Sequence, residues 1–224
     1  MPNVNDITRE SWILGAFPEW GTWLNEEIDQ TSVKPGTFAM WWIGCTGVWV
    51  KTENDTNLAI DLWFGNGKRT QKKKYMDEYH QMANMTGGRL TQPNLRAAPI
   101  VYDPFAVTKV DAVLSTHYHN DHIDPFFAAA VLKNCRADVP FIGPKESVKK
   151  WLSYGVPQER CRVVKPGDLI RVGGSVARLS RGGFGKNLTT GQDNYNKDIW
   201  AGRASVDIGG YGEPVLIRIS GDYT

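Results

Sequence analysis

The chain has 224 residues, a length that suits one domain with a substantial buried core. Hydrophobic residues make up 41% and charged residues 22%, an ordinary globular composition that excludes intrinsic disorder. The formal net charge of +2 gives no reason to expect a nucleic-acid partner, and no apolar stretch approaches the ~18–20 residues that span a bilayer.

The N-terminal part of the chain predicts a β-hairpin that follows a helical or irregular start. Residues 1–30 are polar and read as helical or irregular. The β-rich runs 37–43 and 47–51, joined by the short turn 44–46, predict the hairpin, and residues 58–64 predict a third strand. Most of the nine tryptophans lie in this part, and we predict packing in the core or an interface for Trp12, Trp20, Trp23, Trp41, Trp42, Trp49 and Trp63.

A polar, basic stretch follows at residues 65–74. A run of charge like this is usually a solvated loop, and the functional alternative is capture of a phosphate by its cations, which are Lys68, Arg69, Lys72, Lys73 and Lys74. Residues 75–85 have helical spacing and end at a pair of glycines. His80 lies in this helix with no second ligand-type residue beside it, so we do not expect it to bind a metal.

In the second half, strands alternate with helices. Asp124 and Pro125 predict a helix start, with the aspartate as N-cap and the proline in the first turn. We predict strands at residues 111–115, 139–142, 162–164 and 169–172, and helices at 124–132 and 144–154. The alternation predicts a layered α/β fold.

Three of the four histidines lie within six residues, at His117, His119 and His122, with Asp121 among them. Imidazole and carboxylate together suit borderline divalent metals such as zinc, manganese and iron. The cluster lies on a turn between a predicted strand and a predicted helix, where open α/β sheets commonly place their chemistry. Packing alone is the alternative interpretation, but histidines seldom gather in this way without a metal, so the cluster predicts a metal site.

The pattern His-x-His-x-Asp-His resembles the metal-binding motif of the metallo-β-lactamase superfamily. The resemblance implies an αββα sandwich, incomplete here at its C-terminus, with two stacked sheets between outer layers of helices. It also implies that His117 and His119 bind one metal ion and that Asp121 and His122 bind a second one and take part in catalysis. Asp61, which follows an apolar run, matches the acidic residue that supports the site in that superfamily.

A longer resemblance, to the L-ascorbate-6-phosphate lactonases of that superfamily, extends from about residue 6 to about residue 172. It is carried by residues 7–14, 17–21, 23–28, 35–42, 44–47, 92–96 and 163–168. It implies a metal-dependent hydrolase that opens the lactone ring of L-ascorbate 6-phosphate to give 3-keto-L-gulonate 6-phosphate. The implied cofactor is a divalent metal, Mn²⁺ ahead of Zn²⁺, and the implied partner is a small phosphorylated substrate rather than nucleic acid or a membrane.

We therefore divide the chain into a metallo-β-lactamase-like part, 1–172, and a divergent tail, 173–224. The tail is rich in glycine and bears arginines, and a reading-frame shift near residue 173 is one explanation for it. No histidine follows His122, so the later histidine ligands of the superfamily have no counterpart here. Asp222, in a Ser-Gly-Asp segment, resembles the superfamily's bridging aspartate.

Two other functions remain open at this point. One is a catalytically inactive, truncated remnant, and the other is a metal-dependent phosphodiesterase of the same fold. The three widely spaced cysteines fit neither a disulfide framework nor a metal clip, and the N-terminus has no leader peptide, so we expect a cytoplasmic protein. The tryptophan-rich N-terminal part could supply an interface for a homo-oligomer.

Overall fold

The computed structural model describes residues 2–16, 23–65, 99–165, 167–173, 175–181 and 215–221, the last two ranges as backbone only. The basic stretch after residue 65, His80 and Asp222 lie outside the described residues. Within the described residues, no helix is both long and apolar enough to cross a membrane.

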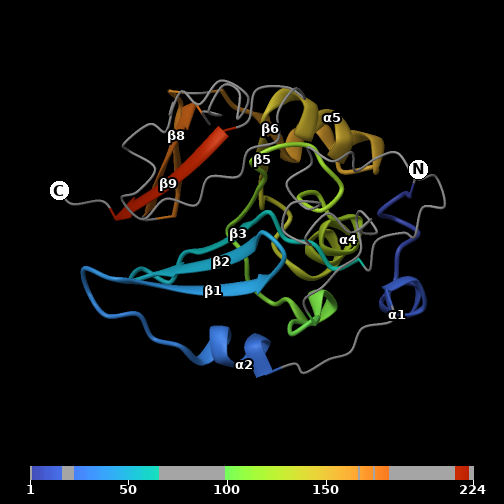
Figure 1. Cartoon of the computed structure of the whole chain (residues 1–224), viewed down its shortest axis with the longest axis horizontal. Helices are drawn as coiled ribbons and strands as arrows, with labels where there is room; N and C mark the ends of the chain where they lie inside the picture. Colours follow the sequence, from blue (N-terminus) through green and yellow to red (C-terminus); the bar gives the residue numbers. More distant parts are fainter. Residues whose placement is uncertain are drawn as a thin grey trace, which may run out of the picture.

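A six-stranded sheet, in the order β1-β2-β3-β4-β5-β6, forms the centre of the molecule (Figure 1). Strands β1 to β3 pair in antiparallel fashion, and β3 to β6 pair in parallel. The predicted hairpin is confirmed, because β1 and β2 are joined by a tight turn. The bounds are β1 Phe38–Gly44, β2 Gly47–Thr52, β3 Asn57–Ile60, β4 Ala112–Leu114, β5 Phe141–Gly143 and β6 Cys161–Val163.

A second, antiparallel sheet contains β7 (Leu169–Val172), β8 (Ser175–Arg181) and β9 (Val215–Gly221). The strands predicted at 162–164 and 169–172 both form, but they belong to different sheets. The prediction that a strand runs to residue 64 is wrong, since β3 ends at Ile60. The next residue, Asp61, has a φ of 50°, a left-handed conformation that leaves the strand.

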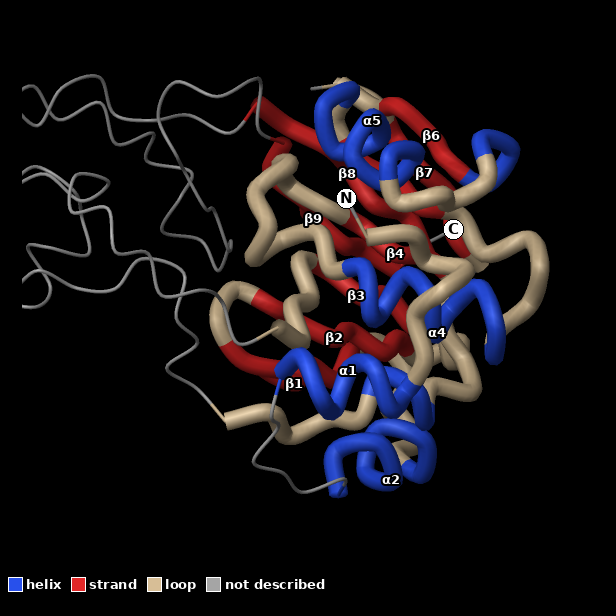
Figure 2. The backbone as a smooth tube through the Cα atoms, turned by 90° about the vertical axis from the view of Figure 1, so that its right-hand side faces the viewer, coloured by secondary structure: helices blue, strands red, loops and turns tan. Residues whose placement is uncertain are grey.

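Helices cover one face of the large sheet, and in Figure 2 α1 and α4 lie in front of its strands. The start of α4 is as predicted: the Asp124 carboxylate caps it by accepting from the backbone N–H of Phe127 at 2.6 Å, and a proline follows. The bounds are α1 Arg9–Ala16, α2 Trp23–Gln30, α4 Pro125–Asn134 and α5 Lys145–Ser153, with short 3₁₀ turns at Pro104–Ala106 and Gln158–Arg160. The core on this side includes Trp12, Ile28, Trp49, Phe127, Phe141 and Trp151.

The small sheet packs against the other face of the large one. Ile170 and Val172 of β7 share a buried cluster with side chains of the large sheet, namely Val50, Leu58, Ala112, Leu114 and Ile142. In Figure 1, β1 to β3 accordingly lie between α2 and the strands β8 and β9. The predicted α/β class is confirmed, with three layers (helices, sheet, sheet) in the described part of the chain.

Core packing, one of the two environments predicted for the tryptophans, is found for three of them and not for Trp42. Trp12, Trp49 and Trp63 are buried, whereas Trp42 is 62% exposed. Trp42 lies on the edge strand β1, where Phe38 and Met40 at alternate positions are also more than 60% exposed. Core packing is therefore the wrong prediction for Trp42, because nothing in the described residues covers that row of the edge strand. Trp41 is half-buried, and Trp20 and the Trp23 side chain lie outside the described residues.

Candidate metal centre

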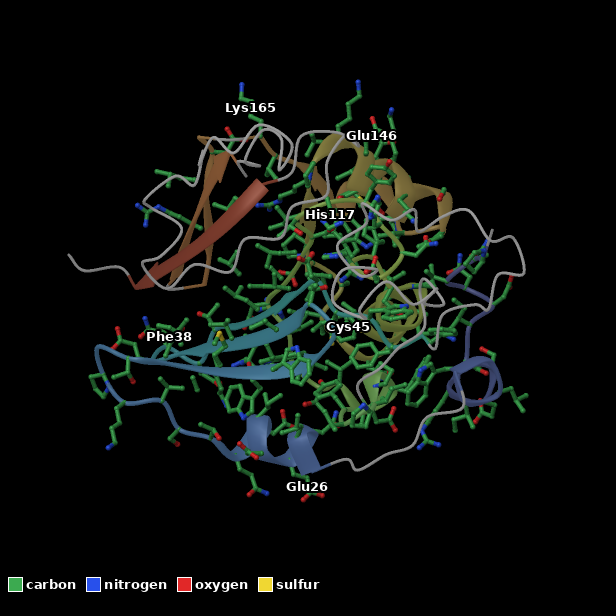
Figure 3. The ribbon with its side chains drawn as sticks, in the orientation of Figure 1. Glu26, Phe38, Cys45, His117, Glu146 and Lys165 are labelled. Atoms are coloured by element: carbon green, nitrogen blue, oxygen red, sulfur yellow. The ribbon has the colours of Figure 1, made fainter. Side chains whose placement is uncertain are left out.

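The histidine cluster lies on the turn between β4 and α4, as the sequence predicts. Strands β3 and β4 run parallel, with Ile60 opposite Leu114, so the residues that follow each strand meet at one edge of the sheet. This register brings Asp61 next to the turn that carries the histidines. Figure 3 shows His117 among closely spaced side chains in the interior of the molecule.

His117 is buried, with 4% of its surface exposed, and its two ring nitrogens differ. Nδ1 lies 3.0 Å from the Thr116 hydroxyl. Nε2 is buried without any hydrogen-bond partner, the sole buried side-chain nitrogen or oxygen of that kind in the described residues. Burial, and after it the neighbouring His122, His119 and Lys150, together lower the pKa of His117 to about 2. The ring is therefore neutral at physiological pH, and Nε2 is an unused ligand atom.

His122 is equally buried and has a comparable arrangement. Its Nδ1 lies 3.0 Å from Oδ2 of Asp61, while its Nε2 lies 3.9 Å from Oδ2 of Asp121. The rings of His117 and His122 are close, with centroids 3.8 Å apart. Thr46, in the turn of the β1–β2 hairpin, places its hydroxyl 3.4 Å from Nδ1 of His122. Two imidazoles thus share one small buried space, each with Nδ1 tied to a neighbouring oxygen.

His119 and Asp121 lie at the rim of this space, and both are half-buried. The ring centroid of His119 is 4.9 Å from that of His117, and the rings are nearly perpendicular. Burial lowers the pKa of His119, although the carboxylate of Asp121 acts in the opposite direction. The side chain of Asp121 is 40% exposed, so this carboxylate can reach both the buried imidazoles and solvent.

Asp61 supports the turn from below through several hydrogen bonds, and it is 2% exposed. Its Oδ1 accepts from the backbone N–H of Thr116 at 2.8 Å, and its Oδ2 accepts from the Thr116 hydroxyl at 2.6 Å. Its own backbone N–H donates to the carbonyl of Leu114 at 3.0 Å. The left-handed backbone of Asp61 aims the carboxylate at the turn, a conformation that non-glycine residues keep where surrounding contacts enforce it.

Sequence reasoning missed three residues that contact this turn: Thr116, Thr46 and Lys150. The α5 residue Lys150 donates from Nζ to the carbonyl of Tyr118 at 2.9 Å and to the side-chain oxygen of Asn120. Burial lowers the pKa of this ammonium. Thr116 directly precedes the cluster, so a hydroxyl in that position could have been singled out. Nothing local in the sequence pointed to Thr46 or Lys150, since each comes from a distant element.

The donor atoms of the turn suit a metal, but the ligand set is not preassembled. Among the described residues, no group of three or more His, Cys, Asp or Glu side chains is already arranged to hold a metal ion. The structure brings together His117, His122 and Asp61 and places His119 and Asp121 at the rim. Asp222 lies outside the described residues. The buried, partnerless Nε2 of His117 is the observation that fits a metal best, because an unsatisfied buried nitrogen is costly unless something binds it.

These features define a mixed α/β protein with a histidine- and aspartate-rich turn at one end of a sheet. Solved structures with related but distant architecture include an isothiocyanate hydrolase from Delia radicum gut bacteria (18% identity, TM-score 0.45, 83% of this chain and 59% of that one). Another is the metallo-β-lactamase fold protein YhfI from Bacillus subtilis (13% identity, TM-score 0.42, 82% of this chain and 58% of that one).

The sequence relatives are much closer, and they confirm the resemblance seen in the sequence. The chain is 60% identical over 172 residues to the protein described as probable L-ascorbate-6-phosphate lactonase UlaG from Escherichia coli O139:H28. The same identity holds for the protein of that description from Shigella boydii serotype 18. The match covers 77% of this chain and 49% of the relative, so the chain spans about half the length of the curated relatives it matches. No family model matches the chain.

Proposed function

We propose that this chain carries the metal-binding half of a metal-dependent hydrolase that opens the lactone ring of L-ascorbate 6-phosphate, giving 3-keto-L-gulonate 6-phosphate. The observation that carries the proposal is the 60% identity to the curated lactonases over 172 residues. Wherever that match begins, a 172-residue stretch of a 224-residue chain includes residues 53–172. It therefore includes Asp61 and the whole histidine turn.

The proposed cofactor is a divalent metal, with Mn²⁺ ahead of Zn²⁺. We propose that His117 and His119 bind one ion and that Asp121 and His122 bind a second, with Asp222 as a bridging candidate. The partnerless Nε2 of His117 supports this assignment. So do the Nδ1 contacts of His117 and His122, since a metal-binding imidazole usually has its other nitrogen held by an oxygen.

The residues of the turn would each contribute differently to lactone opening. A divalent ion held here would supply a water activated near neutral pH and a positive charge that polarises a carbonyl. Burial keeps His117 neutral, so protons do not compete for its Nε2 at physiological pH. Asp121, half-exposed at the rim, lies where a carboxylate could accept a proton from the attacking water. The Lys150 ammonium, tied to the carbonyl of Tyr118, adds fixed positive charge beside the turn.

A second candidate, a remnant without activity, is favoured by one specific observation. No three ligand-type side chains are preassembled in the described residues. Two-metal catalysis needs both ions clamped, so a chain with an incomplete set would hold metal weakly. A phosphodiesterase would use the same kind of turn, and it is retained only as an outcome of the test.

The test measures metal content and hydrolysis on the same preparations. The chain is loaded with Mn²⁺ or Zn²⁺, desalted, analysed by elemental mass spectrometry and assayed with L-ascorbate 6-phosphate and with a chromogenic phosphodiester. His119→Ala should lower bound metal, and the matched variant His80→Ala should not. Lactone opening supports the proposal. Hydrolysis of the phosphodiester alone would identify a phosphodiesterase, and bound metal without turnover of either substrate would identify the remnant.

A further inference from the structure

The Thr116 hydroxyl contacts two groups at once, and both contacts are buried. Its oxygen lies 2.6 Å from Oδ2 of Asp61 and 3.0 Å from Nδ1 of His117. The same Asp61 oxygen lies 3.0 Å from Nδ1 of His122. One carboxylate oxygen is therefore linked directly to one histidine, and through a hydroxyl to the other.

The position of the hydroxyl proton follows from these distances. A hydroxyl has one proton to donate, and its oxygen can also accept. A 2.6 Å contact between a hydroxyl and a carboxylate is a charge-assisted hydrogen bond, and two oxygens without a proton between them would repel at that distance. The Thr116 proton therefore lies on the side of Asp61, and the Thr116 oxygen faces His117 as an acceptor.

The tautomer of His117 then follows in turn. Because the Thr116 oxygen is an acceptor, Nδ1 of His117 must carry a proton to complete the 3.0 Å contact. Nε2 is buried with no acceptor that a proton on it could reach, so the ring proton lies on Nδ1 and Nε2 bears a lone pair. At His122 a carboxylate oxygen stands in the place of the hydroxyl, since Nδ1 lies 3.0 Å from Oδ2 of Asp61.

We propose that Thr116 is a positioning residue that extends control of the tautomer from Asp61 to His117, so that His117 presents an unprotonated Nε2 to the metal. The inference rests on the metal site proposed above. It adds that the side chain just before the histidine cluster determines where the proton of the first histidine resides. An aliphatic side chain of the same shape would fill the same space but could not accept from Nδ1.

The first measurement needs no metal. A long-range proton–nitrogen correlation spectrum of the ¹⁵N-labelled full chain at neutral pH reports the tautomer of each imidazole, and His117→Gln assigns the His117 signals. We expect His117 predominantly in the Nδ1–H form, although the free imidazole side chain prefers Nε2–H in water. A predominant Nε2–H form of His117 in the unaltered chain would overturn the proposal.

The variants Thr116→Val and Thr116→Ser then separate the hydroxyl from the shape of the side chain. Valine should shift His117 toward Nε2–H and weaken Mn²⁺ or Zn²⁺ binding by about 10- to 100-fold, the usual cost of losing such an outer contact. Serine should leave the tautomer and the affinity nearly unchanged. An unchanged tautomer in a folded Thr116→Val chain would contradict the proposal. If His117 of the unaltered chain is in the Nδ1–H form but the chain binds neither metal, the control of the tautomer by Thr116 is supported and the proposed metal site fails.

Discussion

The charge of His117 is controlled by its surroundings more strongly than that of any other histidine described here. Its pKa falls to about 2 because the ring is desolvated, against about 6.5 in an unfolded chain. Between these values the unfolded chain binds a proton that the folded chain does not. Stability from this source is therefore complete above pH 6.5 and is lost progressively as the pH falls below it.

We expect this residue to contribute a slope of about 1.4 kcal/mol in unfolding free energy for each pH unit below 6.5. Urea unfolding of the metal-free chain at several pH values between neutral and about 4.5 measures the slope, and His117→Gln should reduce it by about that amount. The comparison uses slopes, so any overall loss of stability in the variant does not matter. Parallel pH profiles for the two chains would show that His117 is already charged or solvated in the folded state.

For single residues, the sequence predicted which side chains belong to the candidate site better than it predicted which neighbours they contact. His117, His119, Asp121 and His122 stand out because ligand-type residues are adjacent in the chain, and a local pattern survives folding. Asp61 was identified only through the family resemblance, and its proximity to the turn depends on the parallel register of β3 and β4. Thr116 directly precedes the cluster, but its contact with Asp61 joins residues 55 positions apart and is not visible in a local pattern.

The N-terminus of α4 connects the histidine turn to the rest of the core. Asp124 accepts from Phe127 at the first turn of the helix, and its other oxygen accepts from the backbone N–H of Phe64 at 2.9 Å. Phe64 lies just beyond β3, so a single buried carboxylate joins the segments that follow β3 and the turn. Asp124 is 4% exposed, which strengthens both bonds by excluding water.

Asp124→Ala should lower the unfolding free energy by about 2–4 kcal/mol. The loss combines a helix cap, about 1 kcal/mol, with a buried N–H of Phe64 left without an acceptor, about 1–3 kcal/mol. Urea unfolding measures it. The matched control is Asp138→Ala, the same truncation at a side chain that is 76% exposed, where we expect less than about 0.5 kcal/mol. Equal losses in the two variants would mean that the cap contributes nothing beyond a surface carboxylate.

The sequence predicted well the helices and strands that depend on neighbouring residues, but it did not predict how the strands combine into sheets. The β1–β2 hairpin and the start of α4 follow from turn residues and a capping pair, both of which act within a few positions. Residues 162–164 and 169–172 were recognised as strands, but sheet membership depends on partners far along the chain, and the pattern contains no information about them. Likewise, the exposure of Trp42 follows from the edge position of β1 and not from its apolar sequence.

The two faces of the six-stranded sheet are covered to different extents. The large sheet has a full helical core on one side, and on the other it meets β7 through Ile170 and Val172. On that second face, Val48 and Val50 of β2 pack into the inter-sheet cluster, whereas their partners across the strand pair, Trp42 and Met40, are exposed. An apolar row of this kind next to a buried interface favours self-association.

We expect the 224-residue chain to bind metal weakly and to open L-ascorbate 6-phosphate poorly or not at all. In the described residues His119 and Asp121 lie at the rim and not with the buried His117 and His122, and two-metal catalysis needs both ions clamped. The decisive comparison is with a chain whose reading frame is restored near residue 173. We expect the restored protein to hold about two metal ions, to turn over substrate and to elute as a defined species in size-exclusion chromatography.

The 224-residue chain should instead retain little metal and aggregate at high concentration, because the row on β1 stays exposed. His119→Ala in the restored protein is the control that separates the two causes. It should abolish metal binding and turnover while leaving the elution profile unchanged, since His119 lies at the rim of the turn and far along the chain from β1. Equal metal content and equal activity in the unaltered and restored chains would show that the sequence after residue 173 is functional as it stands.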